Sequence, residues 1–309
     1  LMSFGSCFGQ TFFISIFAAH IMADYGLTHG DWGRIYGTGT LASGLLMIWV
    51  GGLADKFRVR TLAVAVLSIL TAFCVWMATN TALWALPFII FGLRFAGQGM
   101  LFHIGMVAMA RWFAGARGRA IAIAQLGFSV GEAFLPLIFA LLLTSYSWRT
   151  LWMIPATLAI VMIPLSLWLL KQERTPQSLA ASDISTGMNG RQWTRNMAIK
   201  HWLIWSLAPL IMGPSAFSTA FFFLQVHFAQ TKGITHEALT ALFPIFTIAT
   251  IGFALCYGWA VDKFGATRLL PLIGIPWVFG FLAMFVADGY GMMILGFICM
   301  ALAQGGNGT

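Results

Sequence analysis

Charged residues are scarce in this chain, at 8% of its 309 residues, against about 25% in a typical soluble domain. Sixty per cent of the residues are hydrophobic and the mean hydropathy is +0.86, which indicates an integral membrane protein. The apolar runs are too long, and lack the period-two alternation, for an outer-membrane barrel. Because backbone groups in lipid must be satisfied within their own segment, we expect all-α spans.

The sequence also has few residues of the kinds that build metal, redox or catalytic sites. Its four cysteines stand singly in apolar runs, at Cys7, Cys74, Cys256 and Cys299. Without a C-x-x-C or Cys/His pairing, we predict neither disulfides nor a metal site. No nucleotide-binding G-x-x-x-x-G-K-[ST] motif is present, and the spans hold no paired carboxylates or nucleophile with its base. We therefore expect no enzyme and no cofactor.

Apolar windows long enough to cross a bilayer, about 20 residues each, occur ten times: 2–23, 33–54, 61–79, 83–110, 119–143, 149–170, 201–229, 237–261, 268–287 and 289–309. The one long polar stretch, residues 171–200, reads as a linker. We predict a six-helix bundle over 1–170 and a second, incomplete bundle of about four helices over 201–309. The sequence begins at Leu1 and stops inside the equivalent of a fourth span, so we interpret it as a fragment lacking roughly two spans.

Positive charges are distributed unevenly between the two sides of the predicted membrane. Thirteen of the 17 Lys and Arg residues fall on one side: Lys56, Arg58, Arg60, Arg111, Arg117, Arg119, Lys171, Arg174, Arg191, Arg195, Lys200, Lys263 and Arg268. The positive-inside rule then places the linker and the N-terminus in the cytoplasm, with the chain in an inner (plasma) membrane. The net charge of +8 is explained by topology and contact with the lipid bilayer, so we expect no nucleic-acid partner.

The chain contains an internal repeat with a constant offset of 207 residues. The matched landmarks are His20 with His227, Gly26-Leu-Thr-His29 with Gly233-Ile-Thr-His236, Gly51 with Gly258, and Asp55-Lys-Phe57 with Asp262-Lys-Phe264. With a slip of one residue, Gln98-Gly99 matches Gln304-Gly305. Because both charged loops fall on the same side, the two halves are expected to be parallel repeats of six spans each.

Three segments carry a resemblance to the major facilitator superfamily. Gly51-Gly-Leu-Ala-Asp55-Lys-Phe-Arg-Val-Arg60 is similar to that family's loop signature between helices 2 and 3, and Arg94-Phe-Ala-Gly97-Gln98-Gly99 resembles its helix 4 signature. The run Arg111-Trp-Phe113, Arg117-Gly-Arg119 and Gly127-x-x-x-Gly131 looks like the helix 4–5 region of bacterial facilitators related to monocarboxylate porters. Helix 5 lacks the Gly-Pro pair of the drug-antiporter signature, since Pro136 comes five residues after Gly131.

The resemblance implies a gate built from the charged loops. In the family the first-half aspartate, here Asp55, latches onto helix 11 and holds the outward-open state. Pseudo-symmetry makes helix 5 the partner of Asp262. The residues implied in gating are Gly51, Asp55, Lys56, Arg60, Asp262, Lys263, Arg117 and Arg119.

Arg94 and Glu132 are the charged residues deepest in the predicted spans. Each lies about 11 residues from the cytoplasmic face, near 16 Å deep at 1.5 Å per residue, so we predict that they share a level and interact directly or through water or substrate. A charge at mid-bilayer costs roughly 2.5–3.5 kcal/mol on insertion scales. The alternatives are a substrate or proton role and a fixed structural pair between helices 4 and 5.

Further polar residues share faces with these two. Gln125 and Ser129 lie on the same face of helix 5 as Glu132, and Gln98 lies on the same face of helix 4 as Arg94. Gln10 is a polar candidate in helix 1. Two polar faces at one depth predict a cavity wall.

These patterns favour a secondary transporter that works by alternating access on a small-molecule substrate, driven by a proton or another coupling ion. Glu132 is the candidate proton site and Arg94 the candidate anion site. Together with the resemblance of the helix 4–5 region to monocarboxylate porters, these residues predict proton-coupled transport of a small, monocarboxylate-like organic anion. The alternatives are efflux of hydrophobic, drug-like compounds by proton antiport, and a membrane receptor or sensor on a transporter fold. The substrate itself is not specified by the sequence.

Overall fold

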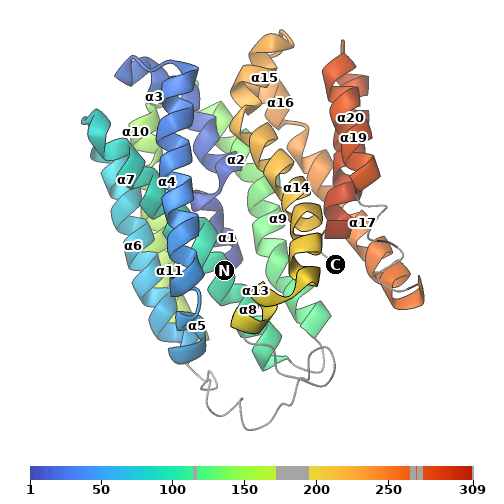
Figure 1. Cartoon of the computed structure of the whole chain (residues 1–309). Helices are drawn as coiled ribbons and strands as arrows, with labels where there is room; N and C mark the ends of the chain where they lie inside the picture. The colour runs from blue at the N-terminus through green and yellow to red at the C-terminus, as the bar shows by residue number, and fades with distance from the viewer. Residues whose placement is uncertain (114–116, 172–194, 265–268, 270–273, 308–309) are drawn as a thin grey trace. The chain divides into compact units, whose positions relative to one another are not determined.

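The computed structural model describes residues 1–113, 117–171, 195–264, 269 and 274–307, and every regular element in these residues is a helix (Figure 1). The chain divides into two compact units, Leu1–Asp183 and Ile184–Thr309. Each unit is described by itself below.

The N-terminal unit contains six spans, each built from one or more helices. The first span comprises α1 (Met2–Ser6), the 3₁₀ turn η1 (Cys7–Gly9), α2 (Thr11–Ile14), the 3₁₀ turn η2 (Ser15–Phe17) and α3 (Ala18–Tyr25), the second comprises α4 (His29–Val50) and α5 (Leu53–Lys56), and the third is α6 (Val59–Thr79). The fourth comprises η3 (Leu83–Ala85), α7 (Leu86–Leu93), the π-helix η4 (Arg94–Leu101) and α8 (Phe102–Trp112). The fifth is α9 (Arg117–Leu142), and the sixth comprises α10 (Trp148–Leu151) and α11 (Met153–Leu169). The helices run back and forth between two ends of the unit (Figure 1).

The C-terminal unit contains α13 (Arg195–Lys200), α14 (Trp202–Phe223), α15 (Gln225–Thr231), α16 (His236–Thr240), α17 (Phe243–Phe264), α19 (Gly274–Val286) and α20 (Tyr290–Asn307). Among the described residues of the whole chain, six helices are long and apolar enough to cross a membrane, and a bent pair over Met2–Tyr25 makes a seventh. Within the described residues, each of the ten predicted windows overlaps one helix or one run of helices. The all-helical membrane fold predicted from composition is therefore confirmed.

An aromatic cluster fixes the first span inside the N-terminal unit. Phe13 and Phe17 stack edge-on or tilted against Phe139 of α9 and against Trp152, with ring centroids 4.8–6.0 Å apart. All four rings are buried. Edge-to-face aromatic pairs contribute more stability than the burial of their apolar surface alone. The part of the first span that carries Phe13 and Phe17 is therefore packed firmly against the fifth and sixth spans.

The turn after the first helix of each half has the same backbone. Gly26 and Gly233 both adopt positive φ, +62° and +65°, the left-handed conformation that glycine accepts without strain. Thr28 and Thr235 then cap the next helix, each accepting a hydrogen bond at 3.2 Å from the backbone N–H three residues later. These positions are 207 residues apart, so the repeat read from the sequence is present in the structure.

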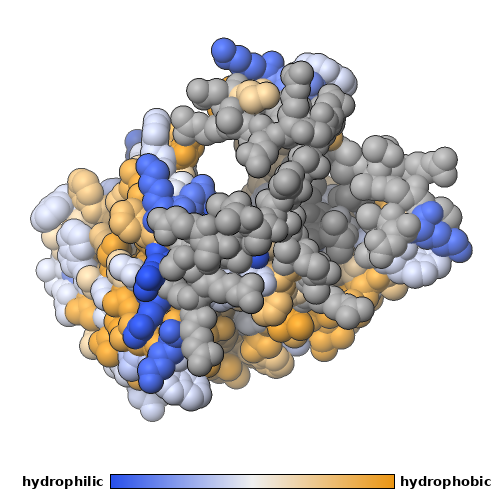
Figure 2. Space-filling model, turned by 90° about the horizontal axis from the view of Figure 1, so that it is seen from below, coloured by the Kyte–Doolittle hydropathy of each residue, from blue (hydrophilic) through white to orange (hydrophobic). Residues whose placement is uncertain are grey.

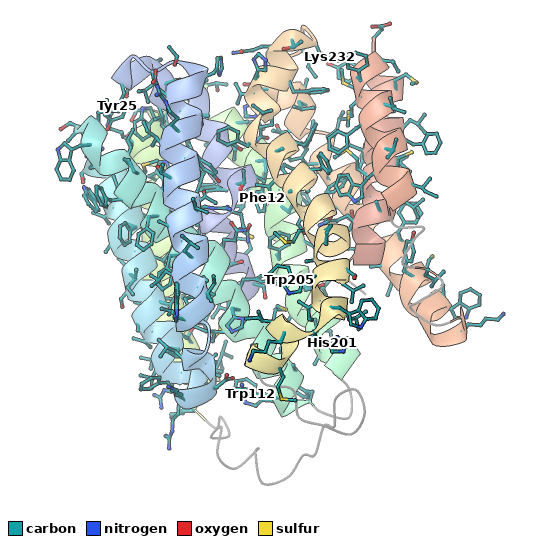
Figure 3. The ribbon with its side chains drawn as sticks, in the orientation of Figure 1. Phe12, Tyr25, Trp112, His201, Trp205 and Lys232 are labelled. Carbon is teal, nitrogen blue, oxygen red and sulfur yellow. The ribbon has the colours of Figure 1, made fainter. Side chains whose placement is uncertain are left out.

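Side-chain contacts repeat as well. The Tyr25 hydroxyl donates to the Asn80 carbonyl oxygen at 2.9 Å, and 207 residues further on Lys232 Nζ donates to the Ala287 carbonyl oxygen at 2.9 Å. Lys232 also donates to the Phe285 carbonyl oxygen at 2.7 Å. Tyr25 and Trp112 mark opposite ends of the N-terminal unit in Figure 3. In both halves the end of the first span is tied to the end of the third.

Candidate functional site

The first span is broken near its middle, where Gln10 is extended (φ −82°, ψ 153°) and the helices on either side meet at 52°. Glycines permit the fourth span to press against this break. A Cβ added to Gly9 would lie 2.2 Å from the Leu93 carbonyl oxygen and 2.7 Å from Gly97 Cα, and one added to Gly97 would lie 2.6 Å from Gly9 Cα. Only glycine fits at both positions.

The fifth span packs against the same stretch. A Cβ added to Gly131 would lie 2.4 Å from Cys7 Sγ, and one added to Gly127 would lie 3.1 Å from the Phe4 backbone nitrogen. Residues 4–9 therefore contact η4 through Gly97 and α9 through this Gly-x-x-x-Gly pair. The break is enclosed by the helices that carry Arg94 and Glu132.

Arg94, the first residue of the π-helix η4, reaches into the break. Its Nη1 donates to Thr11 Oγ1 at 2.8 Å and to the Gly9 carbonyl oxygen at 3.4 Å. Its guanidinium carbon lies 5.6 Å from the centre of the Tyr36 ring, and the Tyr36 hydroxyl also meets Thr11 Oγ1 at 2.9 Å. The side chain is 4% exposed and its Nε has no hydrogen-bond partner. The groups that hold this cation are thus a hydroxyl, a carbonyl and an aromatic ring, all of them neutral.

Glu132 follows Gly131 on α9 and is 7% exposed. Within the described residues it makes no hydrogen bond or ion pair. The direct contact with Arg94 that the sequence allowed is therefore absent from these residues, because Arg94 turns toward the first and second spans. Interaction through water or substrate stays a prediction.

The other candidate residues lie on the faces that the spacing predicted. Gln125 and Ser129 are half-buried on the side of α9 that carries Glu132, while the opposite side is exposed and apolar (Ile123, Leu126, Val130, Phe134). Gln10 is half-buried in the break, and Gln98 is half-buried with its Oε1 enclosed and without a partner.

Polar contacts tie the loop between the second and third spans to α8. Asp55 forms an ion pair with Arg111, which also donates to the Ala54 carbonyl oxygen at 2.8 Å. His103 Nε2 lies 3.1 Å from the Gly51 carbonyl oxygen. From the sequence, Arg111 was counted as a positive charge and as part of the run that resembles the helix 4–5 region, and this contact was not predicted. The signal for its role is the spacing of eight from His103, which places both side chains on one face of the helix.

The remaining gating candidates are only partly described. Lys56 is exposed and Arg60 half-buried, and Lys263 Nζ lies 4.9 Å from the centre of the Trp259 ring. The side chains of Arg117, Arg119 and Asp262 lie outside the described residues, and so does the predicted contact between them. Figure 2 shows the end of the molecule that carries the Gly51–Arg60 loop, where hydrophilic residues border apolar ones.

A polar cluster at the opposite end of the N-terminal unit was missed by the sequence reasoning. Asp24 accepts a hydrogen bond from Trp148 Nε1 at 2.6 Å and forms an ion pair with Arg149. Arg149 Nε donates to the Asn80 carbonyl oxygen at 3.2 Å, and its guanidinium lies over the Trp148 ring. This cluster joins the first, third and sixth spans.

The two halves differ at the positions that surround Arg94. Allowing for the one-residue slip of the fourth span, the counterparts of Thr11, Tyr36 and Arg94 are Ser218, Phe243 and Met300, and all three are buried. Phe243 belongs to an aromatic cluster with Phe222 and Phe297. Phe243 and Met300 are thus apolar where the N-terminal half holds Tyr36 and Arg94, and the C-terminal half packs these two positions without a cation.

Metal ions have no evident place in this arrangement, since the part of the chain that the structure describes contains no group of three or more His, Cys, Asp or Glu residues able to hold one. The polar groups that it does gather in the membrane interior are a guanidinium, a carboxyl, amides and hydroxyls. Side chains of these kinds are able to form hydrogen bonds and ion pairs with small polar molecules.

Comparison with known structures finds the same fold. A bacterial homolog of the human lysosomal transporter Spinster matches with a TM-score of 0.71 at 16% identity, covering 99% of this chain and 72% of that one. The nucleoside transporter NupG (D323A mutant) matches with 0.69 at 12% identity over 99% and 78%. The xylose transporter XylE from E. coli matches with 0.64 at 15% identity over 99% and 81%.

Comparison with curated protein sequences gives no match. The family model of the Major Facilitator Superfamily matches residues 1–309, the whole of the sequence. Together with the helical membrane fold, this match shows a multi-pass membrane transporter of facilitator type. The chain belongs to the major facilitator superfamily.

Proposed function

We propose that this transporter moves a small organic anion together with a proton, with Arg94 binding the anion and Glu132 carrying the proton. The observation that carries the proposal is the environment of Arg94, a buried guanidinium with only neutral partners and an unpartnered Nε. A buried charge is costly unless it is paired. A carboxylate, which guanidinium binds well, supplies the missing negative charge.

Glu132 is suited to the proton because it is buried without a cationic partner in the described residues. Protonation removes a charge whose insertion into a membrane costs roughly 2.5–3.5 kcal/mol. An anion bound at Arg94 disfavours a second negative charge nearby, so anion binding favours the protonated carboxyl. This relation links the two solutes and gives symport.

The rest of the cycle follows the family's alternating access. The two bundles rock about the site, and the Gly51–Arg60 loop, held to α8 through Asp55 and Arg111, moves with the N-terminal bundle. The distribution of Lys and Arg favours a cytoplasmic position for this loop, the N-terminus and the linker, and the proposed location is an inner membrane. A proton symporter for D-xylose is among the structures of similar fold, and the choice of an anion here depends on Arg94.

Proteoliposomes that report internal pH test the proposal. Small carboxylates should acidify the interior in the wild type, and Glu132→Gln should abolish the acidification. Glu237→Gln makes the same chemical change at the start of α16 and should leave acidification in place. Arg94→Gln should lower the apparent affinity for the carboxylate strongly, because the binding cation is removed.

The rival functions give different results in this assay. Proton movement driven only by lipophilic cations indicates efflux of hydrophobic compounds, and binding of a ligand without any proton movement indicates a receptor. Acidification that survives Glu132→Gln excludes Glu132 as the proton site.

A further inference from the structure

Two enclosed polar atoms without partners lie four residues apart on η4. Arg94 Nε is a hydrogen-bond donor and Gln98 Oε1 is an acceptor, and both are buried without a hydrogen bond. Both residues lie beside Gly9, since Arg94 Nη1 donates to the Gly9 carbonyl oxygen and a Cβ on Gly9 would lie 2.8 Å from the Gln98 backbone nitrogen. The two residues that carry the donor and the acceptor therefore both belong to the part of η4 that packs against the first-span break.

The chemistry of this pair narrows the substrate class. Residues four apart on a helix have Cβ atoms about 5–6 Å from each other, a separation that one small molecule bridges. A carboxylate oxygen accepts from Arg94 Nε, while Gln98 Oε1 accepts from a group that donates. We propose that the substrate is a small hydroxy acid, with its carboxylate on Arg94 and its hydroxyl, on carbon 2 or 3, donating to Gln98. This inference rests on the anion site proposed above.

Energetics favour a ligand for Gln98. A buried carbonyl oxygen left without a hydrogen bond destabilises the protein by the full free energy of its desolvation. An apolar side chain of similar size would avoid that cost. A site built to hydrogen-bond a substrate hydroxyl also rejects the analogue that lacks it far more strongly than an apolar pocket distinguishes one methylene. The glutamine thus lowers stability in the empty protein and selects the substrate when it is bound.

The second half of the repeat sharpens the assignment. Gln304, the counterpart of Gln98, also has an enclosed Oε1 without a partner. Four residues before it stands Met300, fully buried and apolar, in place of Arg94. The acceptor is repeated but its neighbouring cation is not, so the donor–acceptor pair that matches a hydroxy acid lies in the N-terminal unit.

The experiment compares pairs of acids that differ only in the hydroxyl. Proteoliposomes are offered 2-hydroxypropanoate, 3-hydroxypropanoate and propanoate, and initial acidification rates give kcat/KM for each. For the wild type we expect one of the hydroxy acids to exceed propanoate by about tenfold to a hundredfold. Gln98→Met, close in size but without the acceptor, should remove that preference and leave propanoate within about twofold. Gln230→Met, the same change at an exposed site on α15, should keep the preference.

The results separate this inference from the proposed function. Equal rates for all three acids in the wild type, or an equal loss for all three in Gln98→Met, overturn the hydroxy-acid assignment while the anion symporter stands. Failure of every carboxylate to move protons refutes the symporter and this inference with it. If Gln98→Met does not fold, thermal unfolding of the wild type tests the hydroxy-acid assignment. The assignment requires that hydroxy acids raise the melting temperature of the wild type at lower concentration than propanoate does.

Discussion

Replacing Gly9 by alanine should destabilise the protein and disturb the anion site together. The added Cβ would lie 2.2 Å from the Leu93 carbonyl oxygen, 2.7 Å from Gly97 Cα and 2.8 Å from the Gln98 backbone nitrogen. Carbon contacts are favourable at about 3.5–4.0 Å, so the first and fourth spans must separate by roughly 1 Å. All three atoms belong to the backbone, and no rotation of a side chain relieves the clash.

The magnitude follows from measured costs of overpacking. An extra methyl group in a well-packed core typically costs about 1–3 kcal/mol, and the rigid surroundings of Gly9 place this change near the upper end. Gly9 belongs to the unit Leu1–Asp183, and for a unit of about 150–250 residues 1 kcal/mol shifts the melting temperature by about 2–4 °C, so a fall of roughly 5–10 °C is expected. Separation of the spans also draws Arg94 away from the Gly9 carbonyl oxygen and Thr11, and carboxylate affinity should fall with it.

Thermal unfolding in detergent and carboxylate binding measure the two effects. Gly37→Ala is the matched control, because a Cβ there meets nothing within 4 Å and alanine is favoured over glycine inside a helix by about 1 kcal/mol. Gly97→Ala should resemble Gly9→Ala, since it presses on the same contact from the other side. A melting temperature for Gly9→Ala equal to that of Gly37→Ala would refute the close packing at the break.

Three further changes test the polar contacts outside this site. A double-mutant cycle of Asp24→Ala and Arg149→Ala in thermal unfolding should give a coupling of about 0.5–1 kcal/mol for this half-exposed pair, and additive effects would contradict the ion pair. The charge swap Asp55→Arg with Arg111→Asp should restore part of the transport rate that either single change lowers, whereas a further loss would count against the contact. Lys232→Met should lower stability by about 1 kcal/mol because the last carbonyl groups of α19 lose their cation, and Lys232→Arg should lower it less.

The spans could be predicted from sequence because the bilayer sets their length and every backbone group in lipid needs a partner within the helix. The break in the first span could not, since its cause lies elsewhere in the chain. Gln10 is no helix breaker, and the neighbouring Gly9 meets Gly97 from a span 88 residues away. The π-helix over Arg94–Leu101 has no local signature either.

Counting residues along the spans predicted a common depth for Arg94 and Glu132. In the structure Arg94 contacts Gly9 and Thr11, and Gly131, the neighbour of Glu132, lies against Cys7. The counting did not give the partners of Arg94 and Glu132, because depth along a helix leaves the direction of the side chain open. Arg94 is turned toward Thr11 and Tyr36, from two spans that the counting never considered. Asp55 also forms an ion pair with Arg111 of α8, a contact that was not predicted from the sequence.

The repeat supplies a way to tell fold from function within one chain. Gly26 with Gly233 and Thr28 with Thr235, each pair 207 residues apart, hold the same turn in both halves, so these residues serve the fold. Where one half has a polar side chain and the other half has an apolar one, the fold that the two halves share does not require the polar group. Tyr36 has Phe243 as its counterpart, and this difference can be found in the sequence alone once the offset of 207 residues is known. Arg94 is buried beside Tyr36, where the other half has Met300, and this contrast supports the anion-binding role proposed above.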